Sequence, residues 1–154
     1  MDIKIDSLNW DILHLLQENA RTSFADIGRK VGLTSPAVAE RIKKMEDLGV
    51  LEGYKAVVSY SKAGYQLRAI VTLKAFMGKL KPLLQKVPTF KEVINCYRIT
   101  GDENIIMEVV LNDQLHLERF IDQLIQYGET RTNIILSDVI SDAPIGKGKT
   151  VASK

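Results

Sequence analysis

The segment from residue 35 to residue 48 places charged and apolar side chains at helical spacing. At 100° per residue, Val38, Ile42 and Met45 form an apolar stripe, which leaves the opposite side of the helix polar. A DNA major groove admits a helix with such a face. We expect Ser35, Ala37 and Glu40, beside Pro36, to lie nearest base edges, and Arg41, Lys43 and Lys44 to reach phosphates or guanine.

Two short helices joined by a tight turn would position that polar face. Ser23 and Asp26 have the spacing of a capping box at a helix start. Gly32 suits a left-handed helix end, and Ser35 followed by Pro36 suits the start of the next helix. The pattern predicts a helix-turn-helix, which indicates double-stranded DNA as a partner. The alternative is a helical hairpin in an ordinary core, with its charges merely solvated.

A further helix precedes this motif. Asp6 or Ser7 can cap a helix that runs to Asn19 and buries one apolar face. After the motif, the run 54–60 is rich in residues that favour strands. We therefore expect a three-helix domain with a following strand at residues 1–60, and a linker at residues 61–66.

From residue 67 the hydrophobic period alternates between that of strands and that of helices. Strands are expected at 67–76, 92–100, 104–111 and 132–141, and helices at 79–87 and 114–128, with Asp113 as a cap and Gly128 as a helix end. The order βαββαβ predicts a four-stranded antiparallel sheet with two helices on one face, the ferredoxin-like arrangement. The predicted fold class is α+β, with a β linker leading to a ferredoxin-like domain at 67–143 and a flexible basic tail at 144–154.

The predicted strands are apolar on both faces. Val109 alternates with Ile106 and Val110 in the third strand, and Val71 alternates with Ile70 in the first. Because the chain's own helices cover one face, the other face predicts packing against a second copy. We assign Val109 to the face that meets this copy; if the two faces are the other way round, Ile106 and Val110 lie on it instead.

Composition sets limits on the function. The chain has 154 residues, 45% of them hydrophobic, and a net charge of +2, which alone would not indicate nucleic acid. Residues 21–62, however, carry eight basic side chains against five acidic ones. No apolar run is long enough to cross a bilayer and no leader is visible, so we expect a cytoplasmic protein without a membrane partner.

Catalytic or metal chemistry finds little support in the sequence. Cys96 is the only cysteine, and His14 and His116 are the only histidines, so no cluster has metal-ligand spacing. Neither histidine lies at a recognisable spacing from a nucleophile, and no glycine-rich phosphate loop is present. We expect no metal, no cofactor and no enzymatic activity.

The order of several short motifs resembles the Lrp/AsnC, or feast/famine, family of transcriptional regulators. The resemblance rests on residues 6–13, 19–21, 26–28, 38–42, 48–50 and 101–102. It implies a sequence-specific DNA-binding regulator that forms dimers, commonly assembling to octamers. It also implies a small effector, usually an amino acid, bound between dimers near the turn after the second strand.

That turn departs from the family pattern. The family commonly has Gly-Asp, an aromatic residue and Asp, where this chain has Gly101, Asp102, Glu103 and Asn104. A carboxylate holds an ammonium group more strongly than a neutral amide does. The resemblance therefore implies an effector site at residues Gly101 to Asn104, with Thr130 and Thr132 nearby, but with a weakened grip on the ammonium group.

Two other functions remain open from the sequence. One is an architectural protein that coats DNA without an effector. The other is a metabolite-binding enzyme, since ferredoxin-like sheets also host catalysis. DNA binding without sequence preference would indicate the architectural protein, and an effector-dependent change in DNA binding would indicate the regulator.

Overall fold

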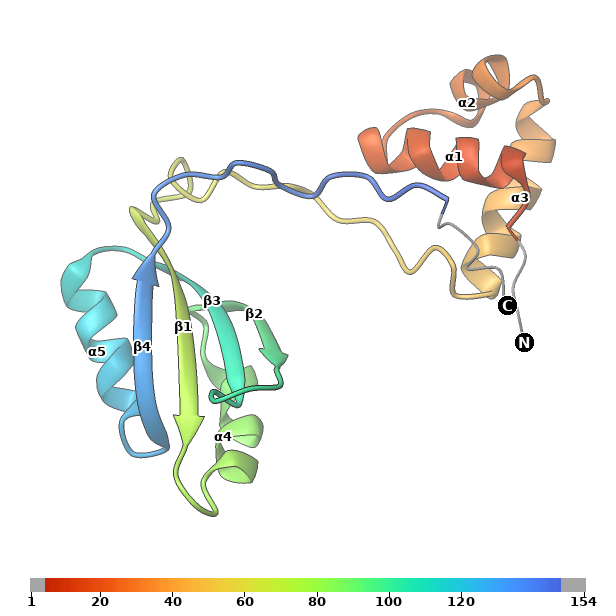
Figure 1. Ribbon diagram of the computed structural model, residues 1–154. Coiled ribbons are helices and arrows are strands. Elements are labelled where there is room, and N and C mark those ends of the chain that lie inside the picture. The colour runs from red at the N-terminus through yellow and green to blue at the C-terminus, as the bar shows by residue number, and fades with distance from the viewer. Residues whose placement is uncertain (1–4, 148–154) are drawn as a thin grey trace. The chain divides into compact units, whose positions relative to one another are not determined.

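The computed structural model describes residues 5–147 and divides them into two compact units (Figure 1). The helical unit contains residues 5–57 together with residues 140–147, and the sheet unit contains residues 58–139. Residues 148–154, most of the predicted basic tail, lie outside the described residues. Within the sheet unit, residues 60–64 of the predicted linker region form a turn that Tyr65 N–H closes onto Tyr60 O at 2.9 Å.

Three helices make up the core of the helical unit: α1 at Ser7–Glu18, α2 at Phe24–Val31 and α3 at Ser35–Asp47. Of the two predicted alternatives, Asp6 and not Ser7 caps α1, by accepting the Asn9 N–H at 2.7 Å. Ser23 likewise caps α2 through the Asp26 N–H. The Asp26 carboxylate accepts the Ser23 hydroxyl rather than completing the capping box on the backbone.

The predicted cap of α3 was wrong by one residue. Thr34, not Ser35, has the extended backbone of a cap, and its Oγ1 accepts the Ala37 N–H at 3.4 Å. Ser35 and Pro36 therefore occupy the first turn of the helix. Either hydroxyl residue suits a cap, and the position of the α2–α3 turn decides between them.

Glycine allows the two helices of the motif to meet closely. A Cβ at Gly28 would lie 2.3 Å from Leu33 O, so only glycine fits there. Gly32 ends α2 with a φ of +73°, in the left-handed region. Behind them Ile12, Ile27 and Val38 are fully buried, which forms the core of the helical unit.

The predicted strand at 54–60 is absent from the described structure. Residues 52–59 have no regular secondary structure, and Val57 remains 83% exposed. A strand needs the N–H and C=O groups of a neighbour, and no described residue pairs with this segment along a ladder. Tyr54 is held by its hydroxyl, which donates to Glu46 at 2.9 Å, and Ser59 is held at the far end, where its carbonyl oxygen accepts the Ala63 N–H at 3.0 Å.

The sheet unit has the predicted ferredoxin-like topology, with all pairings antiparallel and strand order β2-β3-β1-β4. Its elements are β1 at Leu67–Ala75, α4 at Leu80–Lys86, a 3₁₀ turn at Val87–Thr89, β2 at Val93–Arg98, β3 at Ile105–Leu111, α5 at Gln114–Leu124 and β4 at Gly128–Ile134. Figure 1 shows α4 and α5 on the same face of the sheet. Asp113 caps α5 as predicted, by accepting the His116 N–H at 2.7 Å.

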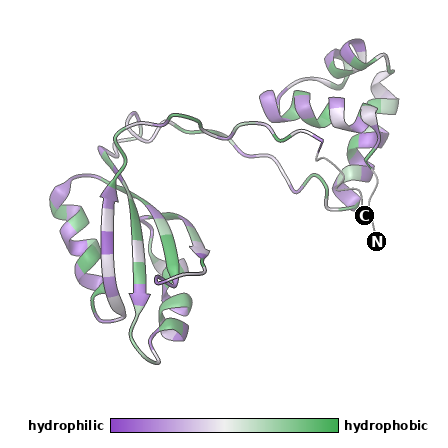
Figure 2. Ribbon diagram, viewed as in Figure 1, coloured by the Kyte–Doolittle hydropathy of each residue, from purple (hydrophilic) through white to green (hydrophobic). Residues whose placement is uncertain are grey.

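The core lies between this helical layer and the sheet. Leu73, Met107 and Phe120 are fully buried, and the rings of Phe90 and Phe120 meet edge to face with centroids 5.5 Å apart. Figure 2 shows that β3 is mostly hydrophobic, as its sequence IIMEVVL requires.

The face of the sheet opposite the helices, named here the open face, differs from the prediction in two ways. Val109 is fully buried on the helix side, so its assignment to the partner-facing side was wrong. By strand alternation, Ile70 and Ile106 lie on the open face instead. That face is also partly polar, since Arg68 donates to Glu108 there at 2.7 Å. Alternation in the sequence fixes which residues share a face but not which face the helices cover.

The last helix begins at residue 114 as predicted but ends earlier, and the last strand both begins and ends earlier than predicted. Gly128 does not end α5; it begins β4, where an added Cβ would lie 2.2 Å from Lys74 O. β4 ends at Ile134 rather than at residue 141, because it pairs with β1 from Ala75 opposite Gly128 to Ala69 opposite Ile134.

Candidate nucleic-acid interface and ligand-binding turn

Helix α3 presents the polar face that the sequence predicts. Val38, Ile42 and Met45 are buried against the rest of the helical unit. On the other side, Pro36, Glu40, Lys43 and Lys44 are exposed, while Ser35, Ala37 and Arg41 are half-buried. The structure thus places the seven predicted DNA-contacting residues on or beside one accessible side of a single helix.

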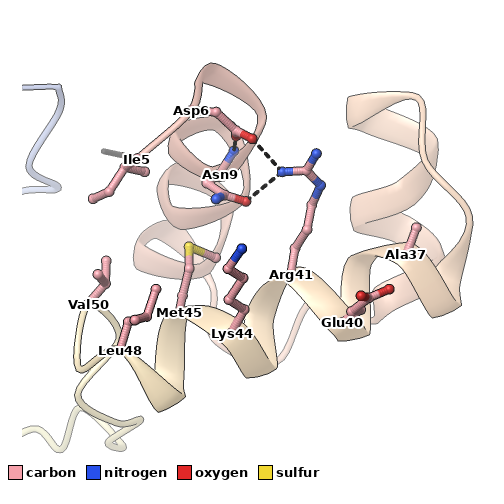
Figure 3. A pocket seen from close by; sticks show the side chains of 10 residues that line it. All are labelled: Ile5, Asp6, Asn9, Ala37, Glu40, Arg41, Lys44, Met45, Leu48 and Val50. Atoms are coloured by element: carbon pink, nitrogen blue, oxygen red, sulfur yellow. Dashed lines mark hydrogen bonds and ion pairs between the residues drawn. The ribbon is translucent and has the colours of Figure 1, made fainter. Parts of the chain in front are cut away.

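Arg41 differs from the neighbouring lysines because it is bound within the unit. Its Nη1 donates to Asp6 Oδ2 at 2.7 Å and to Asn9 Oδ1 at 3.0 Å, which ties α3 to the start of α1 (Figure 3). The hydrogen bond from Arg41, followed by that from the Asn9 N–H, lowers the pKa of the Asp6 carboxyl. Sequence reasoning missed Asp6 and Asn9 as partners of α3, because they lie more than thirty positions away.

Lys43 and Lys44 form no ion pair with any residue from 5 to 147. Both side chains are exposed and carry positive charge one turn along the helix from Glu40. Such groups suit phosphate contact, because binding to DNA releases counterions from the phosphates they neutralise.

A shallow pocket of about 390 Å³ lies between the beginning of α1 and α3 (Figure 3). Met45, Leu48 and Val50 supply apolar groups to it, and Glu40 and Lys44 supply charges of opposite sign. The Arg41 interactions with Asp6 and Asn9 cross one side of this pocket. The hydrogen bonds of Arg41 to Asp6 and Asn9 therefore fix the polar face of α3 against the beginning of α1.

The turn between β2 and β3 holds the residues predicted to meet an effector. Gly101 has a φ of +114°, which favours glycine. Asn104 is a structural residue: its N–H donates to Leu73 O at 2.9 Å, and its Oδ1 accepts the Ala75 N–H at 2.7 Å. Glu103 forms an ion pair with Arg131 of β4 at 3.4 Å. The exposed members of the turn are Gly101 and Asp102.

The two predicted threonines lie in the middle of β4 rather than at its start. Thr130 is opposite Leu73 and Thr132 is opposite Val71, so both side chains point to the helix side of the sheet. The β4 residue that meets the turn is Arg131, which the sequence reasoning missed. Strand alternation could have identified Arg131, because it lies between the two threonines and its side chain points to the opposite face of the strand.

Other chemistry-bearing side chains are dispersed. Burial raises the pKa of the Cys96 thiol, which disfavours the reactive thiolate. Within residues 5–147, no three His, Cys, Asp or Glu side chains are grouped so that they could hold a metal ion. No helix in this range is long and apolar enough to cross a membrane.

Two family models match the chain. Residues 5–46 match the AsnC-type helix-turn-helix domain, and residues 68–145 match the Lrp/AsnC ligand binding domain. The transcriptional regulator LrpB of Bacillus subtilis is 34% identical over 139 residues, which cover 89% of this chain and 92% of LrpB. The first family model thus spans α1 to α3, and the second spans the sheet unit from residue 68 together with residues 140–145 of the helical unit.

Solved structures show the same fold. Bacillus subtilis LrpC superposes with a TM-score of 0.85 at 26% identity, covering 90% of this chain and 99% of LrpC. A Neisseria meningitidis transcriptional regulator, solved as a complex with L-methionine, superposes with a TM-score of 0.87 at 21% identity, covering 92% of this chain and 96% of that one.

Proposed function

The chain belongs to the Lrp/AsnC family of transcriptional regulators, and from this premise we propose that it reads specific DNA sequences through α3. It combines an AsnC-type helix-turn-helix with an Lrp/AsnC ligand-binding domain. Its named relatives are transcriptional regulators rather than enzymes. The observation that carries the proposal is the exposed polar side of α3, opposite the buried Val38, Ile42 and Met45.

In this proposal, different residues on the exposed side of α3 contact the bases and the phosphates of the DNA. Ser35, Ala37 and Glu40 near the beginning of the helix face base edges, with Pro36 beside them. Lys43 and Lys44 neutralise phosphates. Arg41 keeps its bonds to Asp6 and Asn9 through Nη1 and offers its remaining guanidinium donors to the DNA.

DNA binding tests this assignment directly. A duplex selected from a random-sequence pool is titrated with the native chain and with the Lys43→Ala/Lys44→Ala variant at several salt concentrations. Loss of two phosphate contacts should weaken binding on all sequences and reduce the salt slope by about two. The matched control is Lys81→Ala/Lys91→Ala, which removes two exposed lysines of the sheet unit.

Two results would contradict the proposal. Wild-type affinity of the Lys43→Ala/Lys44→Ala variant at physiological salt would remove these lysines from the interface. Equal affinity for the selected duplex and for unrelated duplexes would instead indicate an architectural protein.

We also propose that the chain works as a homodimer. Ile70 and Ile106 lie on an open sheet face, and residues 52–59 form an extended segment without a paired strand among the described residues. A second copy of the chain would cover the open face, and its own extended segment would pair with residues 52–59. Assembly to octamers is an expectation from the family, and native mass measurement checks it.

For the ligand-binding domain we propose an amino acid effector at the turn from Gly101 to Asn104. The Neisseria meningitidis protein that shares this fold was solved with L-methionine, which supports an amino acid as the chemical class. Backbone N–H groups of a glycine turn suit a carboxylate, and Asp102 is the exposed carboxylate available to an ammonium group. Thr130 and Thr132 lie on the helix side of β4, the face opposite Arg131, so we treat them as neighbours of this site and not as ligand contacts.

A thermal-shift series with the twenty amino acids tests the effector. A ligand that binds only the folded chain raises its melting temperature by mass action. Asp102→Asn should abolish the shift of whichever amino acid gives one, whereas Asp122→Asn, an exposed carboxylate on α5, should leave it unchanged. Shifts unaffected by Asp102→Asn would place the ligand elsewhere.

A further inference from the structure

Residues 140–147, named here the strap, belong to the helical unit although they follow the last strand. The Gln17 side chain of α1 holds the backbone of Ile145 at two atoms. Gln17 Nε2 donates to Ile145 O at 3.0 Å, and Gln17 Oε1 accepts the Ile145 N–H at 2.8 Å. One amide thus pairs with both backbone groups of one residue, as a neighbouring strand would.

From this geometry we propose that α1 carries a docking site for the strap and that Gln17 is the residue that recognises it. Gln17 Nε2 also donates to Leu13 O at 3.3 Å, which holds the amide in position on its own helix. The Ile145 side chain is 70% exposed, so the contact depends on the backbone and not on the side chain at this position.

The other end of the same stretch of chain is fixed in the sheet unit. Arg68 Nη1 donates to Asp138 Oδ2 at 2.6 Å, and the Ile135 N–H donates to Arg68 O at 2.9 Å. From Asp138 to Ile145 the extended chain can span at most about 25 Å. When the strap is docked, this short stretch of chain is therefore held at both ends, at Asp138 and at Ile145.

The two hydrogen bonds of the docking contact are easily broken. Both bonds join neutral groups at an exposed site, where water competes for them. Apolar burial adds little, since Val139 is 92% exposed and Ile140 is 77% exposed. The strap thus alternates between a docked state, in which Gln17 holds the Ile145 backbone, and a released state, in which that backbone is free of Gln17.

Amide hydrogen exchange in the full-length chain tests the proposal at Ile145. Gln17→Ala should increase the exchange rate of the Ile145 amide about fivefold, because the acceptor of that N–H is lost. In Ile145→Ala the amide of residue 145 should exchange at nearly the native rate, because both hydrogen bonds to Gln17 use backbone atoms and remain. Gln126→Ala is the matched control, since Gln126 bonds only to its local backbone at Gln123 O.

Trypsin cleavage after Lys147 gives a second measurement, since proteases need a released backbone. Cleavage should be several-fold faster in Gln17→Ala than in the native chain, and unchanged in Ile145→Ala and Gln126→Ala. Equal Ile145 exchange in the native chain and Gln17→Ala would overturn the proposal. Protection that disappears on dilution would also overturn it, because another copy would then fill the site.

Discussion

At the residue scale, one helix carries cations in two different situations. Arg41 is bound to Asp6 and Asn9, whereas Lys43 and Lys44 are exposed and unpaired within the described chain. The helical projection placed all three on or beside the polar side. It could not find the partner of Arg41, because that contact depends on how α1 packs against α3.

The Asp6 interaction predicts a specific pH dependence of stability. The Arg41 hydrogen bond holds the pKa of folded Asp6 below its ordinary value of 3.8. Asp6 therefore stabilises the helical unit above that value, and the contribution is lost as pH falls through the lower folded pKa. Asp6→Asn should melt below the native chain at pH 7, and the difference should be smaller at about pH 3, below the ordinary pKa of Asp6.

Fluorescence of Trp10, the only tryptophan, reports this transition because it packs against the core of the helical unit. Glu129→Gln, which changes an exposed carboxylate of the sheet unit, should leave the transition unchanged at both pH values. A constant difference between Asp6→Asn and the native chain at all pH values would contradict the assigned role of Asp6.

We predict that the substitution Asn104→Asp increases the affinity of the chain for an amino acid. Asn104→Asp keeps the Oδ1 acceptor that holds the Ala75 N–H, so the fold should be retained. The added charge beside Asp102 and Glu103 should tighten amino acid binding by one to two decades, since a charged hydrogen-bond partner contributes about 1.5–3 kcal/mol. Calorimetry of both proteins measures the change. No binding to either protein would make this segment a plain hairpin turn.

At the element scale, the sequence predicts helices better than strand partners. Asp6, Ser23 and Asp113 were found as caps because a cap acts on a backbone group three residues away. The missing strand at 54–60 and the early end of β4 depend on partners far along the chain. Local propensity cannot supply that information.

The α2–α3 turn predicts a large effect from one methyl group. Gly28→Ala would place its Cβ 2.3 Å from Leu33 O, a backbone atom that cannot rotate away. The free energy of unfolding of the helical unit should fall by about 1–3 kcal/mol, as expected for overpacking. Urea denaturation followed by Trp10 fluorescence measures this. Ala25→Gly, at an exposed α2 position, shows the smaller effect of helix propensity alone.

At the scale of the whole molecule, the two faces of the sheet have different tasks. The helix side contains Val71, Leu73 and Met107, all fully buried, and forms the core of the sheet unit. The open face combines Ile70 and Ile106 with the Arg68–Glu108 ion pair. The sequence predicted that both faces carry apolar residues. It could not show that the open face already satisfies some of its polar groups within one chain.

This asymmetry predicts opposite outcomes for two lysine substitutions in β3. Val109→Lys places a charge beneath α4 and α5, so the sheet unit should lose several kcal/mol of stability and its β signal in circular dichroism. Ile106→Lys places the charge on the open face, so the chain should fold but fail to dimerise. Ile125→Lys, at the exposed C-cap position that follows α5, is the control that should still dimerise. Sedimentation of the full chain at micromolar concentration measures the result. A folded Ile106→Lys dimer, or a monomeric native chain, would contradict association through the open face.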